Sequence, residues 1–172
     1  YFMLWGDKPY YSLDYFLKKT FGEKVMKITL DGGFTCPNRD GKIAFGGCTF
    51  CSSRGSGEFA GNRLKSIHDQ FLDQKNMMKK KWKSNKYIAY FQAYTNTYAP
   101  VEYLKKLYDE ALNEEGVVGI SIGTRPDCLS DDVIKLLSYY NNKTFLTVEL
   151  GLQTSNDHTG KLINRGHDSK CF

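Results

Sequence analysis

Short apolar segments alternate with longer amphipathic ones along most of this 172-residue chain, and this alternation constrains the fold more than any other feature. Apolar or alternating runs of four to eight residues are typical of strands, and apolar residues repeating every three or four positions are typical of helices. The predicted strands are 24–30, 87–91, 117–122 and 145–150, and the predicted helices are 66–83, 101–113 and 133–140. Repeated strand–helix units form parallel sheets through right-handed crossovers. The sequence therefore predicts an α/β fold with a parallel sheet.

Polar segments of unusual composition follow every predicted strand. They are the cysteine-bearing loop 31–51, the turn 93–100, the segment 123–127 and the segment 149–154. In parallel α/β folds the chemistry lies at the carboxyl ends of the strands, because the loops that follow them meet at one edge. We therefore expect the functional residues of this chain to converge at that edge.

The five cysteines restrict the chemistry that this edge can perform. Cys48 and Cys51 form a C-x-x-C motif, and eleven residues separate Cys36 from Cys48. Glycine and other turn-forming residues lie close to all three, which is typical of a loop wrapped around an object. Cys128 and Cys171 lie far along the chain, and the odd total argues against a secreted disulfide scaffold.

Three interpretations of the cysteines remain open. In the first, they are buried structural thiols. In the second, they bind zinc, with His68 or Cys128 as the fourth ligand. In the third, three thiolates hold a [4Fe-4S] cluster and leave one iron open to a small ligand. A glycine-rich loop with an incomplete set of thiolates suits the third interpretation, because the open iron can then bind a substrate or cofactor.

The composition excludes several classes of protein. A hydrophobic content of 41% with 25% charged residues is ordinary for a globular chain and argues against disorder. The sequence has neither a membrane-length apolar stretch nor a secretory leader, so we expect a cytoplasmic protein with no membrane contact. It begins with Tyr1 rather than methionine, so we also expect it to be part of a longer chain.

Six segments carry longer motifs: LDGGFTCPNRDG (30–41), GGCTFC (46–51), GSGEF (55–59), YTNTY (94–98), GTRPD (123–127) and INRGH (163–167). Together they resemble the radical S-adenosylmethionine (radical SAM) superfamily and, within it, the uncharacterised YhcC-like group, which is related to the catalytic subunit of Elongator. Most superfamily members carry C-x-x-x-C-x-x-C, and the longer first gap found here is similar to that of the YhcC-like group.

The resemblance implies a particular architecture. It is a partial (β/α) barrel, with about four βα units of the usual six. Residues 23–172 would form the radical SAM core, truncated at its carboxyl end, and residues 1–22 would form an amino-terminal extension packed on this core.

The resemblance also implies a set of cofactors and the residues that bind them. Cys36, Cys48 and Cys51 would bind three irons of a [4Fe-4S] cluster, and S-adenosylmethionine (SAM) would chelate the fourth. One-electron reduction would then cleave SAM to methionine and a 5′-deoxyadenosyl radical. The residues expected to contact SAM are Phe50, Thr95, Asn96, Arg125, Asp127, Glu149 and Gln153.

Structural roles remain open for several of these residues. Phe50 can simply pack beneath the cluster, and Thr95 and Asn96 can form a plain polar turn. Arg125 and Asp127 can form an internal ion pair instead of binding a ligand.

The resemblance implies a one-electron reductant of the flavodoxin or ferredoxin type as a partner, and it favours RNA or tRNA as the substrate. The formal net charge of +5 fits an RNA contact, whereas a solvated helix end explains the basic run 79–83 more simply. Two alternative functions remain open. One is a zinc-stabilised nucleic-acid-binding module, and the other is an inactive, truncated radical SAM fragment.

Overall fold

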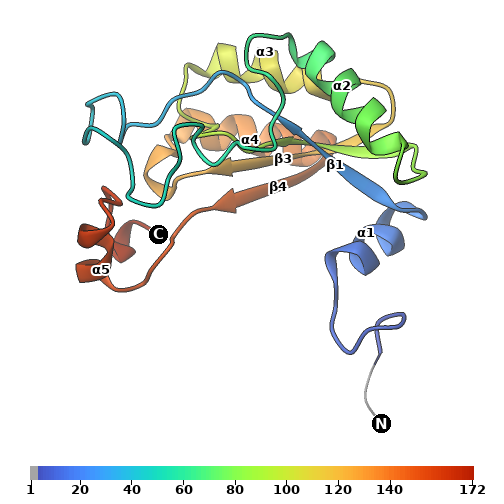
Figure 1. Cartoon of the computed structure of the whole chain (residues 1–172), viewed down its shortest axis with the longest axis horizontal. Helices are drawn as coiled ribbons and strands as arrows, with labels where there is room; N and C mark the ends of the chain where they lie inside the picture. The colour runs from blue at the N-terminus through green and yellow to red at the C-terminus, as the bar shows by residue number, and fades with distance from the viewer. Residues whose placement is uncertain (1–3) are drawn as a thin grey trace.

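Four parallel strands form one sheet in the computed structural model, which describes residues 4–172 (Figure 1). The strands are β1 (Val25–Leu30), β2 (Lys86–Phe91), β3 (Val117–Thr124) and β4 (Phe145–Leu150), in the spatial order β1-β2-β3-β4. Leu30, Phe91 and Ile122 are register partners near the ends of the first three strands, so the carboxyl ends meet at one edge. The predicted α/β fold with a parallel sheet is confirmed, and the open sheet is consistent with a partial barrel.

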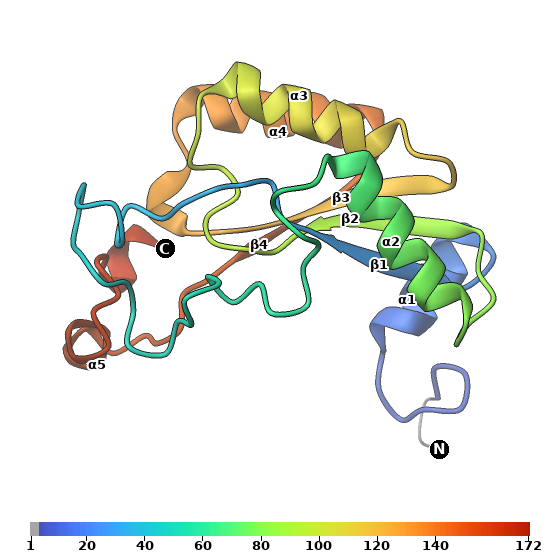
Figure 2. The same ribbon diagram turned by 45° about the horizontal axis from the view of Figure 1, so that its top comes forward.

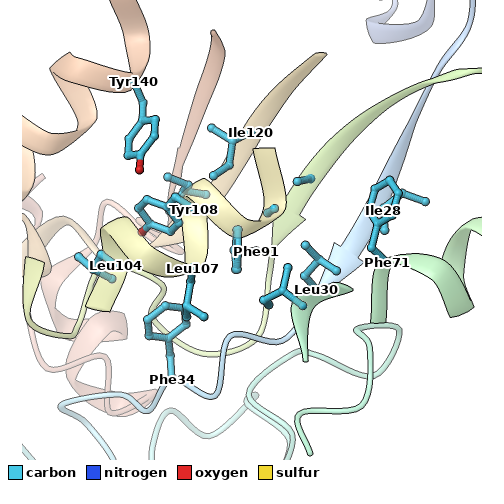
Figure 3. Close-up of a cluster of buried hydrophobic side chains, with 14 of the residues drawn as sticks. Ile28, Leu30, Phe34, Phe71, Phe91, Leu104, Leu107, Tyr108, Ile120 and Tyr140 are labelled. Atoms are coloured by element: carbon cyan, nitrogen blue, oxygen red, sulfur yellow. The ribbon is translucent and has the colours of Figure 1, made fainter. Parts of the chain in front are cut away.

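The helices that connect the strands cover one face of this sheet. They are α2 (Ile67–Lys79), α3 (Val101–Leu112) and α4 (Asp131–Lys143), and Figures 1 and 2 show them on the same side. Right-handed crossovers place successive helices in this way. Their apolar sides pack against alternate strand residues such as Ile28, Phe91 and Ile120, which form the main core (Figure 3). Among the described residues, no helix combines the length and apolarity needed to span a membrane.

A helix within the amino-terminal extension packs on the opposite face of the sheet. This helix is α1 (Leu13–Phe21), and its Leu17 joins Val25 and Ile88 in a second, smaller apolar cluster. α1 was not predicted, although its sequence has clear end signals. The Ser12 side chain accepts a hydrogen bond from the first turn, and Gly22 ends the helix in the left-handed conformation.

Three short helical segments were also not predicted. The 3₁₀ turn η1 (Pro126–Cys128) follows β3, and α5 (Asp157–Leu162) and the 3₁₀ turn η2 (Ser169–Cys171) follow β4. The predicted helix 66–83 ends early, at Lys79, because the chain must turn into β2. The Ser84 hydroxyl fixes this turn by donating to the Lys24 carbonyl at 2.6 Å.

The main core also positions a loop at the carboxyl edge of the sheet. Tyr108 on α3 is fully buried in the main core (Figure 3). Its hydroxyl donates a hydrogen bond to the backbone carbonyl of Asn96. Burial raises the pKa of Tyr108, so the hydroxyl stays protonated and remains a donor. A contact from the core therefore fixes the loop that follows β2.

Candidate functional site

A cavity of about 360 Å³ opens at the carboxyl edge of the sheet. Cys36, Cys48 and Cys51 all line it, whereas Cys128 lines a different cavity. The remaining walls come from the ends of β2, β3 and β4 and from Arg165, which follows α5. Segments more than 100 residues apart in sequence therefore meet around the three thiols.

Tight turns bring the cysteine loop into this position. The N–H of Cys51 donates to the Cys48 carbonyl at 2.9 Å, so both cysteines lie on one turn. Gly47 has a φ of +80°, which L side chains rarely adopt, and a Cβ added there would lie 2.8 Å from Nε of Arg39. Glycine at this position therefore allows the backbone to approach the Arg39 side chain.

Two buried arginines approach the first two cysteines. Nη1 of Arg125 lies 3.9 Å from the sulfur of Cys36, and Nη1 of Arg165 lies 3.5 Å from the sulfur of Cys48. The exposed fractions are 3% for Arg125 and 7% for Arg165. Each of these two arginines therefore places a positive charge close to a cysteine sulfur.

A third arginine accompanies the third cysteine. Arg39 donates to the backbone carbonyl of Cys51 at 2.9 Å and also to the carbonyl of Ser52. Its interaction with the Cys51 side chain raises the pKa of Arg39. Each of the three cysteines thus has a guanidinium group beside it, at the sulfur for Cys36 and Cys48 and at the backbone carbonyl for Cys51.

Arg125 also forms a two-point ion pair with Asp127. Nε and Nη2 of Arg125 lie 2.8 Å and 2.6 Å from the two carboxylate oxygens. Burial acts to raise the pKa of Asp127, but the Arg125 guanidinium outweighs it and holds this pKa below its ordinary value. Asp127 lines a second cavity, of about 510 Å³, on the other side of the pair. The pair therefore separates the two cavities.

Glu149 joins all four strands through one carboxylate. It accepts hydrogen bonds from Lys27 on β1 at 2.6 Å, from Tyr90 on β2 at 2.7 Å and from Ser121 on β3 at 3.0 Å. Burial acts to raise the pKa of Glu149, but these donors lower it below its ordinary value. Glu149 and Tyr90 also line the cavity that contains Cys36, Cys48 and Cys51, which we call the cysteine cavity. The network therefore forms the floor of this cavity.

Comparison with known proteins assigns the family. The sequence model of the radical SAM superfamily matches residues 36–172. This chain belongs to the radical SAM superfamily. It is 58% identical over 166 residues to the uncharacterized protein YtqA of Bacillus subtilis. This match covers 96% of the present chain and 52% of YtqA. It is also 45% identical over 157 residues to protein YhcC of Escherichia coli. That match covers 91% of the present chain and 50% of YhcC.

These comparisons confirm the resemblance to the YhcC-like radical SAM group, and the chain spans about half the length of the curated relatives it matches. The fold is similar to that of Elp3 from Methanocaldococcus infernus with residues 1–46 deleted, with a TM-score of 0.55 and 18% sequence identity. This match covers 86% of the present chain and 33% of Elp3, and it supports the radical SAM type of partial barrel.

Radical SAM proteins typically use a [4Fe-4S] cluster and SAM, and the donor set of this cavity fits such a group. Three thiols and three guanidinium groups line one pocket, so the cations can offset the negative charge of cluster and thiolates. Nε of Arg165 is buried and has no hydrogen-bond partner, which leaves a donor free for a bound group. Cys36, Cys48 and Cys51 could hold such a cluster.

The residues expected to contact SAM lie in different surroundings. Phe50, Thr95 and Gln153 line the cysteine cavity, as do Arg125 and Glu149. Phe50 is 50% exposed, whereas Thr95 is 1% exposed. The remaining two residues do not line this cavity: Asp127 lines the second cavity, and Asn96 is fully buried and lines neither.

Asn96 has a structural contact instead. Its side-chain amide donates to the Gly123 carbonyl at 2.7 Å, and its backbone N–H donates to the same carbonyl at 3.2 Å. Its Oδ1 is buried and has no hydrogen-bond partner. Asn96 therefore ties the loop after β2 to the end of β3.

Sequence reasoning missed two buried residues of the site, Asn38 and Arg165. Nδ2 of Asn38 lies 3.6 Å from the sulfur of Cys48, close to the Arg165 contact with the same sulfur. Both residues occur in motifs that carry the radical SAM resemblance, CPNRDG and INRGH. These motifs were the sequence signal that could have identified Asn38 and Arg165 as site residues. Nothing local in the sequence, however, shows that the CPNRDG and INRGH segments lie side by side.

The zinc alternative lacks a fourth ligand in this arrangement. His68 lies on α2 and contacts Glu114 at 2.8 Å, and Cys128 lines the second cavity. Within residues 4–172, no group of three or more His, Cys, Asp and Glu side chains is gathered around one point as for a single metal ion. A cluster requires less convergence, because each thiolate binds a different iron.

Proposed function

We propose that this chain holds a [4Fe-4S] cluster through Cys36, Cys48 and Cys51 and forms the core of a radical SAM enzyme that reductively cleaves SAM. The observation that carries the proposal is the convergence of these three cysteines, each beside an arginine, on one cavity at the carboxyl edge of a parallel sheet. The position agrees with the general location of active sites in parallel α/β folds.

The reduced cluster, when bound, supplies the electron that cleaves SAM to methionine and a 5′-deoxyadenosyl radical. The protein positions the three thiols and the groups around them. The Gly47 turn and the three arginines position the cysteine loop. The carboxylate of Glu149, already fixed by three donors, offers a rigid acceptor at the cavity floor.

SAM contacts are proposed for the residues that line the same cavity. Phe50 has the exposure needed to stack on an adenine ring, and Thr95 lines the same cavity. Arg125, Glu149 and Gln153 supply polar groups for the methionine and ribose parts of SAM. For Asn96 and Asp127 we propose indirect roles, since one fixes the loop after β2 and the other fixes Arg125.

The substrate and partners of the whole protein are also proposals. We propose RNA or tRNA as the substrate class, on the basis of the Elongator-like motif GTRPD and the net charge of +5. A flavodoxin- or ferredoxin-type protein would supply the electron, and the cytoplasm is the compartment in which such a system would operate.

Anaerobic reconstitution with iron and sulfide tests the proposal. We expect a brown protein that absorbs broadly near ~400 nm and contains about four irons per chain. Incubation of this protein with SAM and dithionite should release 5′-deoxyadenosine, and parallel reactions with and without tRNA test the substrate class. A colourless protein that binds zinc in place of iron would overturn the proposal.

Cys128→Ala and Cys171→Ala remove the two thiols outside the cysteine cavity and are the controls for cysteine loss, so both should load iron as the wild type does. A protein that loads iron but releases no 5′-deoxyadenosine would retain the cluster assignment. It would also assign this half-length chain to the inactive alternative.

A further inference from the structure

Arg165 is a buried cation without a carboxylate partner. Only 7% of its surface is exposed, and across residues 4–172 no carboxylate oxygen lies within 4.0 Å of its guanidinium group. Nη2 donates to the carbonyl of Gly151, Nη1 lies 3.5 Å from the sulfur of Cys48, and Nε has no partner. Because an unpaired buried charge is strongly unfavourable, this guanidinium needs an anion inside the cavity.

Arg125, the other buried arginine of the cavity, is different. Asp127 neutralises it through two short contacts, and its distance to the sulfur of Cys36 is the longer one, 3.9 Å. The positive charge of Arg125 is therefore largely neutralised by Asp127. The charge of Arg165 is available to the thiol side of the cavity.

Cys48 receives two N–H donors at its sulfur. One is Arg165 at 3.5 Å, and the other is Nδ2 of Asn38 at 3.6 Å. All three residues are buried, with exposed fractions of 6% for Cys48 and 0% for Asn38. Water is thus largely excluded from these contacts, which strengthens them.

The backbone around Arg165 is built to hold this arrangement. The N–H of Thr49 donates to the Ile163 carbonyl at 3.0 Å, and the side chain of Asn164 donates to the Gly47 carbonyl at 2.8 Å. A Cβ added to Gly166 would lie 2.3 Å from Oδ1 of Asn38, so the two segments are in close contact. The placement of Arg165 beside Cys48 therefore does not depend on one side-chain rotamer alone.

We infer that Arg165 is a positioning residue which, together with the second N–H donor Asn38, places positive charge and hydrogen-bond donors at the sulfur of Cys48 and thereby raises the reduction potential of the cluster. This inference rests on the proposed function. Reduction adds one electron to a cluster that is already anionic together with its thiolates. A nearby cation and N–H···S hydrogen bonds therefore stabilise the reduced form more than the oxidised form. Arg165 thus makes the one-electron reduction easier.

The test is a potentiometric titration of the reconstituted protein, followed by electron paramagnetic resonance. Arg165→Gln removes the charge, and we expect its midpoint potential to shift to a more negative value than that of the wild type. Arg165→Lys keeps the charge and should recover most of the wild-type potential. Lys135→Gln, which removes a 76%-exposed charge on α4, is the matched control and should leave the potential unchanged.

The outcomes separate the inference from the proposed function. A wild-type chain that binds no iron overturns both. An iron-loaded Arg165→Gln variant with the wild-type potential overturns the inference alone. If Arg165→Gln fails to load iron, then Asn38→Ser decides, because it removes the neutral donor to the same sulfur. A negative shift in this variant supports the inference, and an unchanged potential overturns it.

Discussion

At the scale of single residues, the five cysteines fall into two chemical groups. Cys36, Cys48 and Cys51 line one cavity, and each has an arginine beside it. Cys128 lies outside this cavity, where burial raises the pKa of its thiol to about 12. A thiol with this pKa stays protonated at neutral pH and is a poor metal ligand.

We therefore predict that single substitutions will separate the two groups. Cys36→Ala, Cys48→Ala and Cys51→Ala should each abolish cluster assembly, because each removes one of three iron ligands. Cys128→Ala and Cys171→Ala should keep the wild-type iron content. Iron analysis of the five reconstituted variants measures this, and full iron in any of the first three variants would contradict the assignment.

The Arg125–Asp127 pair allows a residue-scale prediction about stability. Asp127→Ala leaves a 3%-exposed guanidinium unpaired and should destabilise the fold by about 3–5 kcal/mol, the usual cost of breaking a buried pair. The double variant Arg125→Met/Asp127→Leu removes both charges and should lose less folding stability than Asp127→Ala. Urea unfolding of the apo variants measures both values, and equal losses would show that the unpaired charge is not the cause.

At the scale of elements, the four strands are joined by side chains as well as by backbone pairing. Lys27, Tyr90, Ser121 and Glu149 come one from each strand and form a single hydrogen-bonded network. They lie on the face opposite α2, α3 and α4, because they alternate with the strand residues that pack in the main core. The polar network therefore stabilises the face that bounds the cavity.

This network predicts a pH dependence of stability. Because the folded state lowers the pKa of Glu149 below 4.5, its contribution is present above that pH and is lost as the pH falls through the folded pKa. Glu149→Gln should remove this part of the acid sensitivity. Urea midpoints of both proteins at pH 7 and pH 4 measure it, and an equal decrease in the two proteins would contradict the role of Glu149.

At the scale of the whole molecule, two apolar clusters of different size lie on the two faces of the sheet. The main cluster joins three helices to the strands, whereas the smaller one joins α1 to Val25 and Ile88. The functional cavity lies at the opposite end of the sheet from α1, as Figure 1 shows for the loops and the α5 segment. The molecule thus has a main cluster that holds three helices on the sheet and a smaller cluster, distant from the cavity, that holds α1.

Leu104→Ala and Leu17→Ala test this division. Leu104 is fully buried in the main cluster, so its truncation should cost the upper part of the range of about 2–5 kcal/mol. Leu17 is 4% exposed in the smaller cluster, and its truncation should cost the lower part. Urea unfolding measures both, and a larger loss for Leu17→Ala would make α1 an integral part of the main fold.

The sequence alone determined the strand–helix alternation, the parallel sheet and the edge at which the site lies. These features follow from local patterns, namely apolar periodicity and end signals such as Ser66 and Ser130, which cap α2 and α4. The cysteine spacing and the longer motifs likewise determined the family. α1 was not predicted although Ser12 and Gly22 mark its ends, because a nine-residue helix with one buried residue, Leu17, has only a short apolar pattern.

Only the tertiary structure decided which side chains meet. Asn38 contacts the backbone of Asn164, 126 residues away, and Lys27 pairs with Glu149, 122 residues away. Such contacts depend on the register of the sheet and on how the last segment returns to the cysteine loop. No local pattern encodes them, because register and loop return are set by packing between distant segments. For the same reason, Arg165 could be recognised as the partner of Cys48 only in the folded chain.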